Sequence, residues 1–145
     1  MRAKLIADKP VQTYALIFDK GDEVVSTLER FAQNESLTAA HFTAIGALSE
    51  ATLGYFDWQA KDYTKIPIRE QVEVLSLVGD VALKGSEPKV HTHVVLGTAE
   101  GNARGGHLLE GKVRPTLEVI LTASPSYLKR EHDPETGLPL IKIGT

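Results

Sequence analysis

The sequence predicts an α+β fold, a central and mostly antiparallel β-sheet with one main helix at about residues 22–34. Only one segment carries apolar residues at helical spacing, whereas the segments after Thr38 are short apolar or alternating runs typical of strands. The connections between those runs are short, which favours antiparallel pairing of consecutive strands. The 145 residues suffice for one domain, 1–145, with a core that needs no disulfides.

The first predicted elements are a strand and the helix. Residues 11–20, VQTYALIFDK, have apolar side chains at both parities, which indicates a strand buried on both sides or nearly so. Gly21 turns the chain, and Asp22 is the expected N-cap of the helix. The helix has one apolar stripe at helical spacing, formed by Val24, Val25, Leu28, Phe31 and Ala32.

The rest of the chain is predicted as strands separated by turn signals. The expected strands are residues 40–58 (one strand, or two joined at Gly46), 72–83, 89–97, 107–114, 116–123 and a short one at 138–143. The expected breaks are 84–88, 97–106, Arg114-Pro115 and a turn at 133–137.

Two of these strands carry apolar residues at both parities, namely Val74, Leu75, Leu77, Val78, Val94, Val95 and Leu96. One helix covers only part of a sheet, so another surface must cover the rest. A symmetric homo-oligomer is the economical solution, and a closed barrel would also satisfy the pattern.

Three of the five histidines lie close together in the sequence, in KVHTHVVLG and GGHLLEG. His91 and His93 are two residues apart on a predicted strand and therefore project from the same face. If the following loop closes a hairpin, opposing residue numbers sum to about 200–204, and a sum of 200 places His107 directly opposite His93. Three imidazoles would then converge on one face of the sheet.

Three neutral imidazoles form a facial ligand set for a divalent ion and leave positions open for water or a ligand. Zinc is the first candidate, followed by nickel, copper and iron. Two other interpretations stay open for His91, His93 and His107: a cluster that titrates near neutral pH at a subunit interface, or histidines that only pack.

Other candidate residues have weaker patterns. His41 lies in another predicted strand and is either a further member of the cluster or, as we expect, a core residue. His132 is expected to be exposed. Glu110 is an odd number of residues from His107, so on a regular strand its side chain should point to the opposite face of the sheet. Asp80 could be aimed at the cluster by a bulge, but a turn or edge carboxylate is the expected role. No catalytic base stands out, so the sequence assigns no catalytic residue.

Composition restricts the classes of function. There are no cysteines, which excludes disulfides, thiolate zinc sites and a cysteine nucleophile. The net charge of −3 disfavours a nucleic-acid binder without excluding a local basic patch. No apolar run approaches the roughly 20 residues of a membrane helix, and Asp8 and Pro10 interrupt any signal-peptide core. A cytoplasmic protein without membrane contact is the default expectation.

Five motifs in this order resemble the plants-and-prokaryotes-conserved (PPC) domain family, in its stand-alone prokaryotic form: AIGALSEATLGYFD, EVLSLVGDVAL, HTHVVLG, GGHLLEG and PTLEVILT. The resemblance covers residues 11–143, and its most specific part is HTH followed by GGHL. It implies an α+β domain with a central antiparallel sheet, assembled as a homotrimer. In stand-alone members the histidines that match His91, His93 and His107 look placed for a metal.

The resemblance also implies an alternative function. Plant members bind A·T-rich DNA through an AT-hook with an Arg-Gly-Arg-Pro core, and prokaryotic relatives often carry a DNA-binding label. This sequence contains no Arg-Gly-Arg-Pro core. We therefore expect a trimeric domain with an open three-histidine metal site that binds or transforms a small anionic ligand near a subunit boundary. The alternative is a DNA-binding or regulatory scaffold without a hook of its own.

Overall fold

The computed structural model describes residues 1–7, 11–124 and 128–142. Within these residues the chain forms one helix and nine strands: β1 (Arg2–Ala7), β2 (Thr13–Phe18), α1 (Val24–Asn34), β3 (Ala39–Asp57), β4 (Asp62–Ile68), β5 (Val72–Lys84), β6 (Glu87–Gly97), β7 (Ala103–Ala123), β8 (Lys129–His132) and β9 (Pro139–Lys142). The predicted class, mainly sheet with one short helix, is confirmed.

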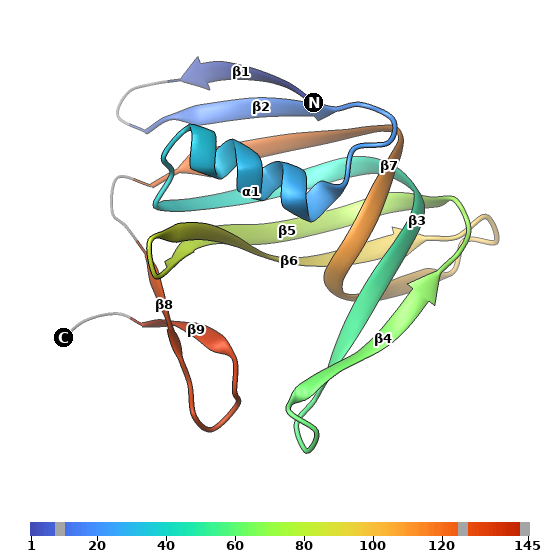
Figure 1. Cartoon of the computed structure of the whole chain (residues 1–145). Coiled ribbons are helices and arrows are strands. Elements are labelled where there is room, and N and C mark those ends of the chain that lie inside the picture. The colour runs from blue at the N-terminus through green and yellow to red at the C-terminus, as the bar shows by residue number, and fades with distance from the viewer. Residues whose placement is uncertain (8–10, 125–127, 143–145) are drawn as a thin grey trace.

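The strands form one sheet in the order β1-β2-β7-β3-β5-β8-β9, with β4 paired to β3 and with β6 paired to both β5 and β7. All pairings are antiparallel except the short parallel contact of β5 with β8. The helix α1 lies across one face of the sheet, and the β3–β4 and β8–β9 hairpins project below it (Figure 1). Three of these strands, β1, β4 and β8, are absent from the sequence prediction.

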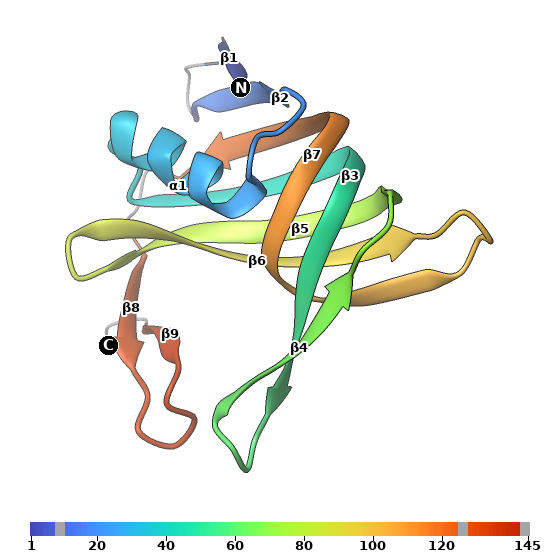
Figure 2. The ribbon, with the colours of Figure 1, turned by 45° about the vertical axis from the view of Figure 1, so that its right-hand side comes forward.

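The two longest strands, β3 and β7, bend together (Figure 2). The bend coincides with register shifts on both sides of Leu48, and Gly46 there has a positive φ of 150°. A Cβ at Gly46 would lie 2.4 Å from the backbone oxygen of Thr116, so only glycine allows the two strands to approach. The predicted break at Arg114-Pro115 is wrong, because Pro115 lies in this irregular stretch, where its missing N–H costs no ladder hydrogen bond.

The helix begins one residue later than predicted, because its N-cap is Glu23 instead of Asp22. The Glu23 carboxylate accepts hydrogen bonds from the backbone N–H groups of Val25 (3.2 Å) and Ser26 (2.7 Å). It also accepts one from the N–H of Gly111 (3.1 Å) and so ties the start of α1 to β7. Asp22 instead accepts from the N–H of Asp19.

Residues of α1, β2, β3, β5, β6 and β7 share one hydrophobic core. Along β5 and β6 the apolar residues divide between two faces: Val74, Leu77, Val94 and Leu96 are buried, whereas Leu75, Val78 and Val95 are exposed. Ile45 and Ile120 add to the exposed apolar surface. The two-sided pattern therefore leaves an apolar face that the described part of the chain does not cover.

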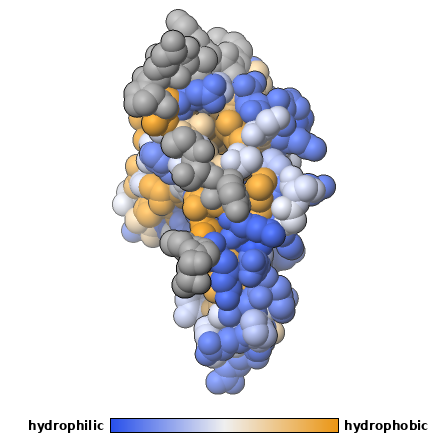
Figure 3. All heavy atoms as spheres, turned by 90° about the vertical axis from the view of Figure 1, so that its left-hand side faces the viewer, coloured by the Kyte–Doolittle hydropathy of each residue, from blue (hydrophilic) through white to orange (hydrophobic). Residues whose placement is uncertain are grey.

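Hydrophobic and hydrophilic residues are unevenly distributed over the surface. On the side shown in Figure 3, hydrophobic residues gather in the middle, above a lower part that is mainly hydrophilic. Among the described residues, no helix is both long and apolar enough to cross a membrane.

Candidate metal centre

The three clustered histidines lie where β7 leaves β6 and joins β3. His107 is paired directly with His93 of β6 and also with Gly54 of β3. The observed register has a sum of 200, at the lower end of the predicted range of about 200–204. Before His93, β6 has no strand partner on its β7 side among the described residues. The fork between β6 and β7 thus opens beside the histidines.

The imidazoles of His91, His93 and His107 converge as predicted. One ring nitrogen from each lies within 4.8 Å of the others. The Nε2 atoms of His91 and His93 are 3.2 Å apart, and the three ring centroids are separated by 5.1 to 5.3 Å. His93 is exposed, whereas His91 and His107 are half-buried, so the cluster is accessible from solvent.

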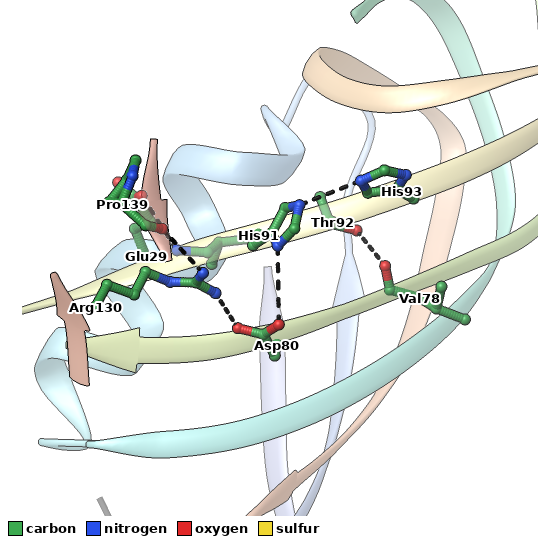
Figure 4. A network of polar contacts seen from close by, with 9 residues as sticks. Glu29, Val78, Asp80, His91, Thr92, His93, Arg130 and Pro139 are labelled. Carbon is green, nitrogen blue, oxygen red and sulfur yellow. Dashed lines mark hydrogen bonds and ion pairs between the residues drawn. The ribbon is translucent and has the colours of Figure 1, made fainter. Parts of the chain in front are cut away.

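Asp80 and Arg130 form a second layer behind His91 (Figure 4). A carboxylate oxygen of Asp80 lies 4.0 Å from His91 Nδ1. Its other oxygen accepts a hydrogen bond from Arg130, which is only 8 % exposed and also donates to the Pro139 carbonyl (3.5 Å). Because Nδ1 of His91 faces Asp80, its Nε2 is left to face the cluster. A carboxylate behind a metal-binding histidine fixes the ring and its tautomer.

The cluster is electrostatically suited to a cation. Burial and the neighbouring His91 and His93 lower the pKa of His107 to about 4. Burial, together with Arg130 and His93, also lowers the pKa of His91, although Asp80 opposes this shift. His91 and His107 are therefore neutral at pH 7 and present lone pairs, which is the form that binds metals.

The ring of Tyr63, on β4, packs against the ring of His107. Their rings are stacked, with centroids 4.6 Å apart and planes inclined by 29°. The ring of Tyr63 can lie there because residue 54 is glycine, where a Cβ would come within 2.7 Å of Tyr63 Cδ1. Burial raises the pKa of the Tyr63 phenol, which keeps it protonated at neutral pH.

These residues fit a divalent metal ion. In tetrahedral zinc sites with Zn–N bonds of about 2.0–2.1 Å, ligand nitrogens lie about 3.4 Å apart, close to the separation of the His91 and His93 Nε2 atoms. The buried Nδ1 of His107 has no hydrogen-bond partner among the described residues, which is costly unless another group binds it. The described part of the chain offers no carboxylate within the cluster, so a bound ion would keep open positions.

The other sequence candidates lie elsewhere or play other roles. His41 is exposed on β3 and lies outside the cluster, so the expected core position is wrong. Asp80 is paired with His41 and His91 inside the sheet, so the expected turn or edge position is also wrong. His132 is exposed, as predicted. Glu110 lines a different cavity, in agreement with its predicted parity.

Sequence reasoning missed Arg130 and Tyr63, and it considered Asp80 but favoured another role for it. Asp80 had a partial signal, because hairpin arithmetic applied to the turn predicted at residues 84–88 gives a sum of about 172, one residue away from the observed sum of 171 that pairs Asp80 with His91. Arg130 and Tyr63 had none, since their strands were not predicted and each arrives from a remote part of the chain.

Comparison with known proteins identifies relatives of this chain. The profile of the Plants and Prokaryotes Conserved (PCC) domain matches residues 6–125. Two bifunctional GlmU proteins from Synechococcus strains are 36% and 35% identical over 130 residues. The match covers 88% of this chain but only 20% and 19% of those proteins, so the chain spans about a fifth of their length.

Solved structures share the fold over almost the whole chain. A plant- and prokaryote-conserved protein from Pyrococcus horikoshii has a TM-score of 0.87 and 33% identity, with 97% of this chain and 99% of that one covered. A metal-containing protein from Archaeoglobus fulgidus has a TM-score of 0.84 and 35% identity, with 99% of both chains covered. A "putative DNA-binding protein" from Ralstonia eutropha has a TM-score of 0.86 and 31% identity, with 95% of both chains covered.

Proposed function

Because this chain belongs to the Plants and Prokaryotes Conserved domain family, we propose that it is a homotrimeric domain with an open divalent-metal site formed by His91, His93 and His107. Zinc is the first candidate, since three imidazoles and an open position suit it. The site binds, and can transform, a small anionic ligand. The convergence of three ring nitrogens within 4.8 Å carries this proposal.

Further observations support the metal. The Archaeoglobus fulgidus relative, 35% identical to this chain, is described as containing metal. The Asp80 carboxylate behind His91 is the kind of partner that usually orients a histidine ligand. The buried Nδ1 of His107 has no hydrogen-bond partner among the described residues, and a bound ion would satisfy it.

The chain's own residues have separate roles in this proposal. A bound ion would act as a Lewis acid or lower the pKa of a bound water. His91, His93 and His107 would hold it, Asp80 would keep the Nδ1 proton of His91 in place, and Tyr63 would shield one face of His107 from water. No described side chain in the cluster is placed as a general base, so binding is the primary activity that we propose.

The trimer is supported by the uncovered apolar face. Val78 is directly paired with His93, and both side chains are exposed. Val95, two residues further along β6, is exposed as well. A second copy that covered this face would lie next to His93 and place the metal site near a subunit boundary. Light scattering coupled to size exclusion should then give three times the chain mass of 15.8 kDa.

Metal analysis by ICP-MS of the untagged protein tests the metal site. Wild type should retain near-stoichiometric zinc or another transition metal, and His91→Ala and His107→Ala should both lose it. His132→Ala, which changes an exposed histidine outside the cluster, is the matched control and should retain it. Equal metal content in wild type and both cluster variants would show that the three-histidine assignment is wrong.

The name of the Ralstonia eutropha relative supports a second candidate, a DNA-binding or regulatory scaffold. This function requires a basic surface in the assembled protein, whereas the chain has a net charge of −3. It predicts binding to duplex DNA whose logarithmic affinity falls linearly with the logarithm of salt concentration. Fluorescence anisotropy with labelled A·T-rich and G·C-rich duplexes would separate it from the metal proposal.

A further inference from the structure

A cavity of about 270 Å³ extends from the histidine cluster along the unpaired edge of β6. His91 and His107 form one end of it, and Tyr63 also lines it. Its other walls come from the β5–β6 hairpin, from Glu29 on α1 and from the β8–β9 hairpin. The volume is just below the range of about 300–1,000 Å³ found for pockets that hold drug-sized ligands. The cavity therefore has room for a small molecule in reach of the proposed metal.

The charged side chains of the cavity favour an anion. Lys84 lines it and makes no ion pair within the described residues. Lys89 lies 3.4 Å from Glu29, the one carboxylate in the lining, and Arg130 is paired with Asp80. Glu29, the one acid of the lining, thus already has a partner, while the positive charges of Lys84 and the proposed metal ion are not balanced by a lining carboxylate.

Apolar groups form much of the remaining wall. Leu138, Pro139 and Leu140 line the cavity from the β8–β9 side, and Val90 lines it from β6. Leu140 is 40% exposed, so it offers apolar surface that a bound ligand could bury. An inorganic anion would leave this surface wet, so the lining suits an anion with an apolar body.

The apolar wall from the β8–β9 hairpin is bonded to the metal centre through Arg130, although it comes from a different part of the chain than the histidines. The histidines lie inside the segment matched by the family profile, residues 6–125, whereas residues 128–142 lie outside it. Arg130 connects the two, because it bonds both to Asp80 behind His91 and to the carbonyl of Pro139 on the wall. The β8–β9 hairpin is thereby held against the cluster as a separate determinant of which ligand fits.

We propose that this cavity binds a small organic carboxylate with an apolar, preferably aromatic, body. Its carboxylate points toward the metal, Lys84 adds positive charge from the part of the cavity formed by the β5–β6 hairpin, and the apolar body packs against Tyr63 and the Leu138–Leu140 wall. This inference rests on the proposed metal function and extends it from anions in general to one class of ligand.

Isothermal titration calorimetry on the zinc-loaded protein tests the proposal with three probes. Benzoate has both the carboxylate and the ring, acetate lacks the ring, and benzamide lacks the charge. Benzoate should bind at least about tenfold more tightly than acetate, because only its ring buries apolar surface, and about tenfold more tightly than benzamide. In cobalt-substituted protein, benzoate should also change the visible absorption spectrum, which reports on the coordination of the ion.

Variants locate the binding site. Lys84→Ala should weaken benzoate severalfold and leave benzamide unchanged, whereas Lys129→Ala, an exposed lysine of β8 outside the cavity, should change neither. Leu140→Ser should remove the advantage of benzoate over acetate, and Ile66→Ser, a matched exposed residue on β4, should preserve it.

The failures are distinguishable. Zinc retained without benzoate binding, or equal affinity for benzoate and acetate, overturns the ligand class and leaves the metal proposal intact. Zinc lost from wild type overturns the metal proposal and, with it, the anchor of the carboxylate.

Discussion

The Asp80→Asn substitution tests whether the carboxylate behind His91 holds that histidine for a metal. Asn has nearly the same shape as Asp and retains one acceptor oxygen, but it lacks the negative charge that faces His91 Nδ1 at 4.0 Å. The change therefore removes charge without creating a cavity.

Two effects of different size should follow. Loss of a partner behind a metal-binding histidine typically costs about 10–100-fold in metal affinity, which corresponds to roughly 1.4–2.7 kcal/mol. The substitution also leaves Arg130, whose side chain is 7% exposed, without its ion pair. Breaking a fully buried pair costs about 3–5 kcal/mol, and we expect about 1–3 kcal/mol here because the Asp80 side chain is 32% exposed.

Competition with a chromophoric zinc chelator measures the affinity, and urea denaturation of the metal-free protein measures the free energy of unfolding. The control Arg130→Met removes the buried charge and retains Asp80, and the double variant lacks both members of the pair. The double variant should recover part of the lost stability but not the zinc affinity, since Asp80 acts on His91 directly.

Zinc affinity in Asp80→Asn equal to that of wild type would refute the positioning role of Asp80. Full recovery of zinc affinity in the double variant would also refute it, because the loss would then come from the unpaired Arg130.

Three further predictions concern the packing, the pH dependence and the helix cap. Gly54→Ala should push the Tyr63 ring off His107, since the new Cβ would lie 2.7 Å from that ring. The variant should lose about 1–3 kcal/mol of unfolding free energy and bind zinc more weakly. Unchanged stability and unchanged zinc affinity would refute this packing. Because the pKa of His107 is about 4 when folded against an ordinary 6.5, the unfolded chain binds more protons between these values. The metal-free protein should therefore lose stability as the pH falls from 6.5 to 4, and His107→Gln should flatten that dependence. Urea titrations in the presence of EDTA measure the stability, and an equally steep pH profile in the variant would contradict the assignment of the effect to His107. Glu23→Ala should lower the melting temperature through a loss of about 0.5–2 kcal/mol of unfolding free energy, because the Glu23 carboxylate caps α1 and accepts from the Gly111 N–H. A loss of stability no larger than that of Glu118→Ala, which changes an exposed strand residue, would argue against the cap.

The successful sequence predictions rest on local periodicity. Residues two apart on a strand share a face, and hairpin partners have a constant sum, so the position of one loop places residues 107–111 opposite His93, a range that includes its observed partner His107. The same rule, applied to the preceding turn, comes within one residue of the pairing of Asp80 with His91.

The failures lie where non-local contacts override the local signal. Pro115 looks like a strand break, yet β7 continues because the proline lies in an irregular part of the ladder with β3. Asp22 has the better capping side chain, but Glu23 caps α1 because its carboxylate also reaches Gly111 on β7.

The sequence by itself determined the fold class, the family resemblance and the three histidines that share a face, because each depends on spacing along one strand or across one turn. Only the tertiary structure decided what surrounds them. Arg130 and Tyr63 reach the cluster from strands distant in the chain, and the cavity exists because β7 leaves β6 at His107 to pair with β3. Such contacts depend on how strands with no shared period come together, and the spacing of residues within one strand carries no information about them.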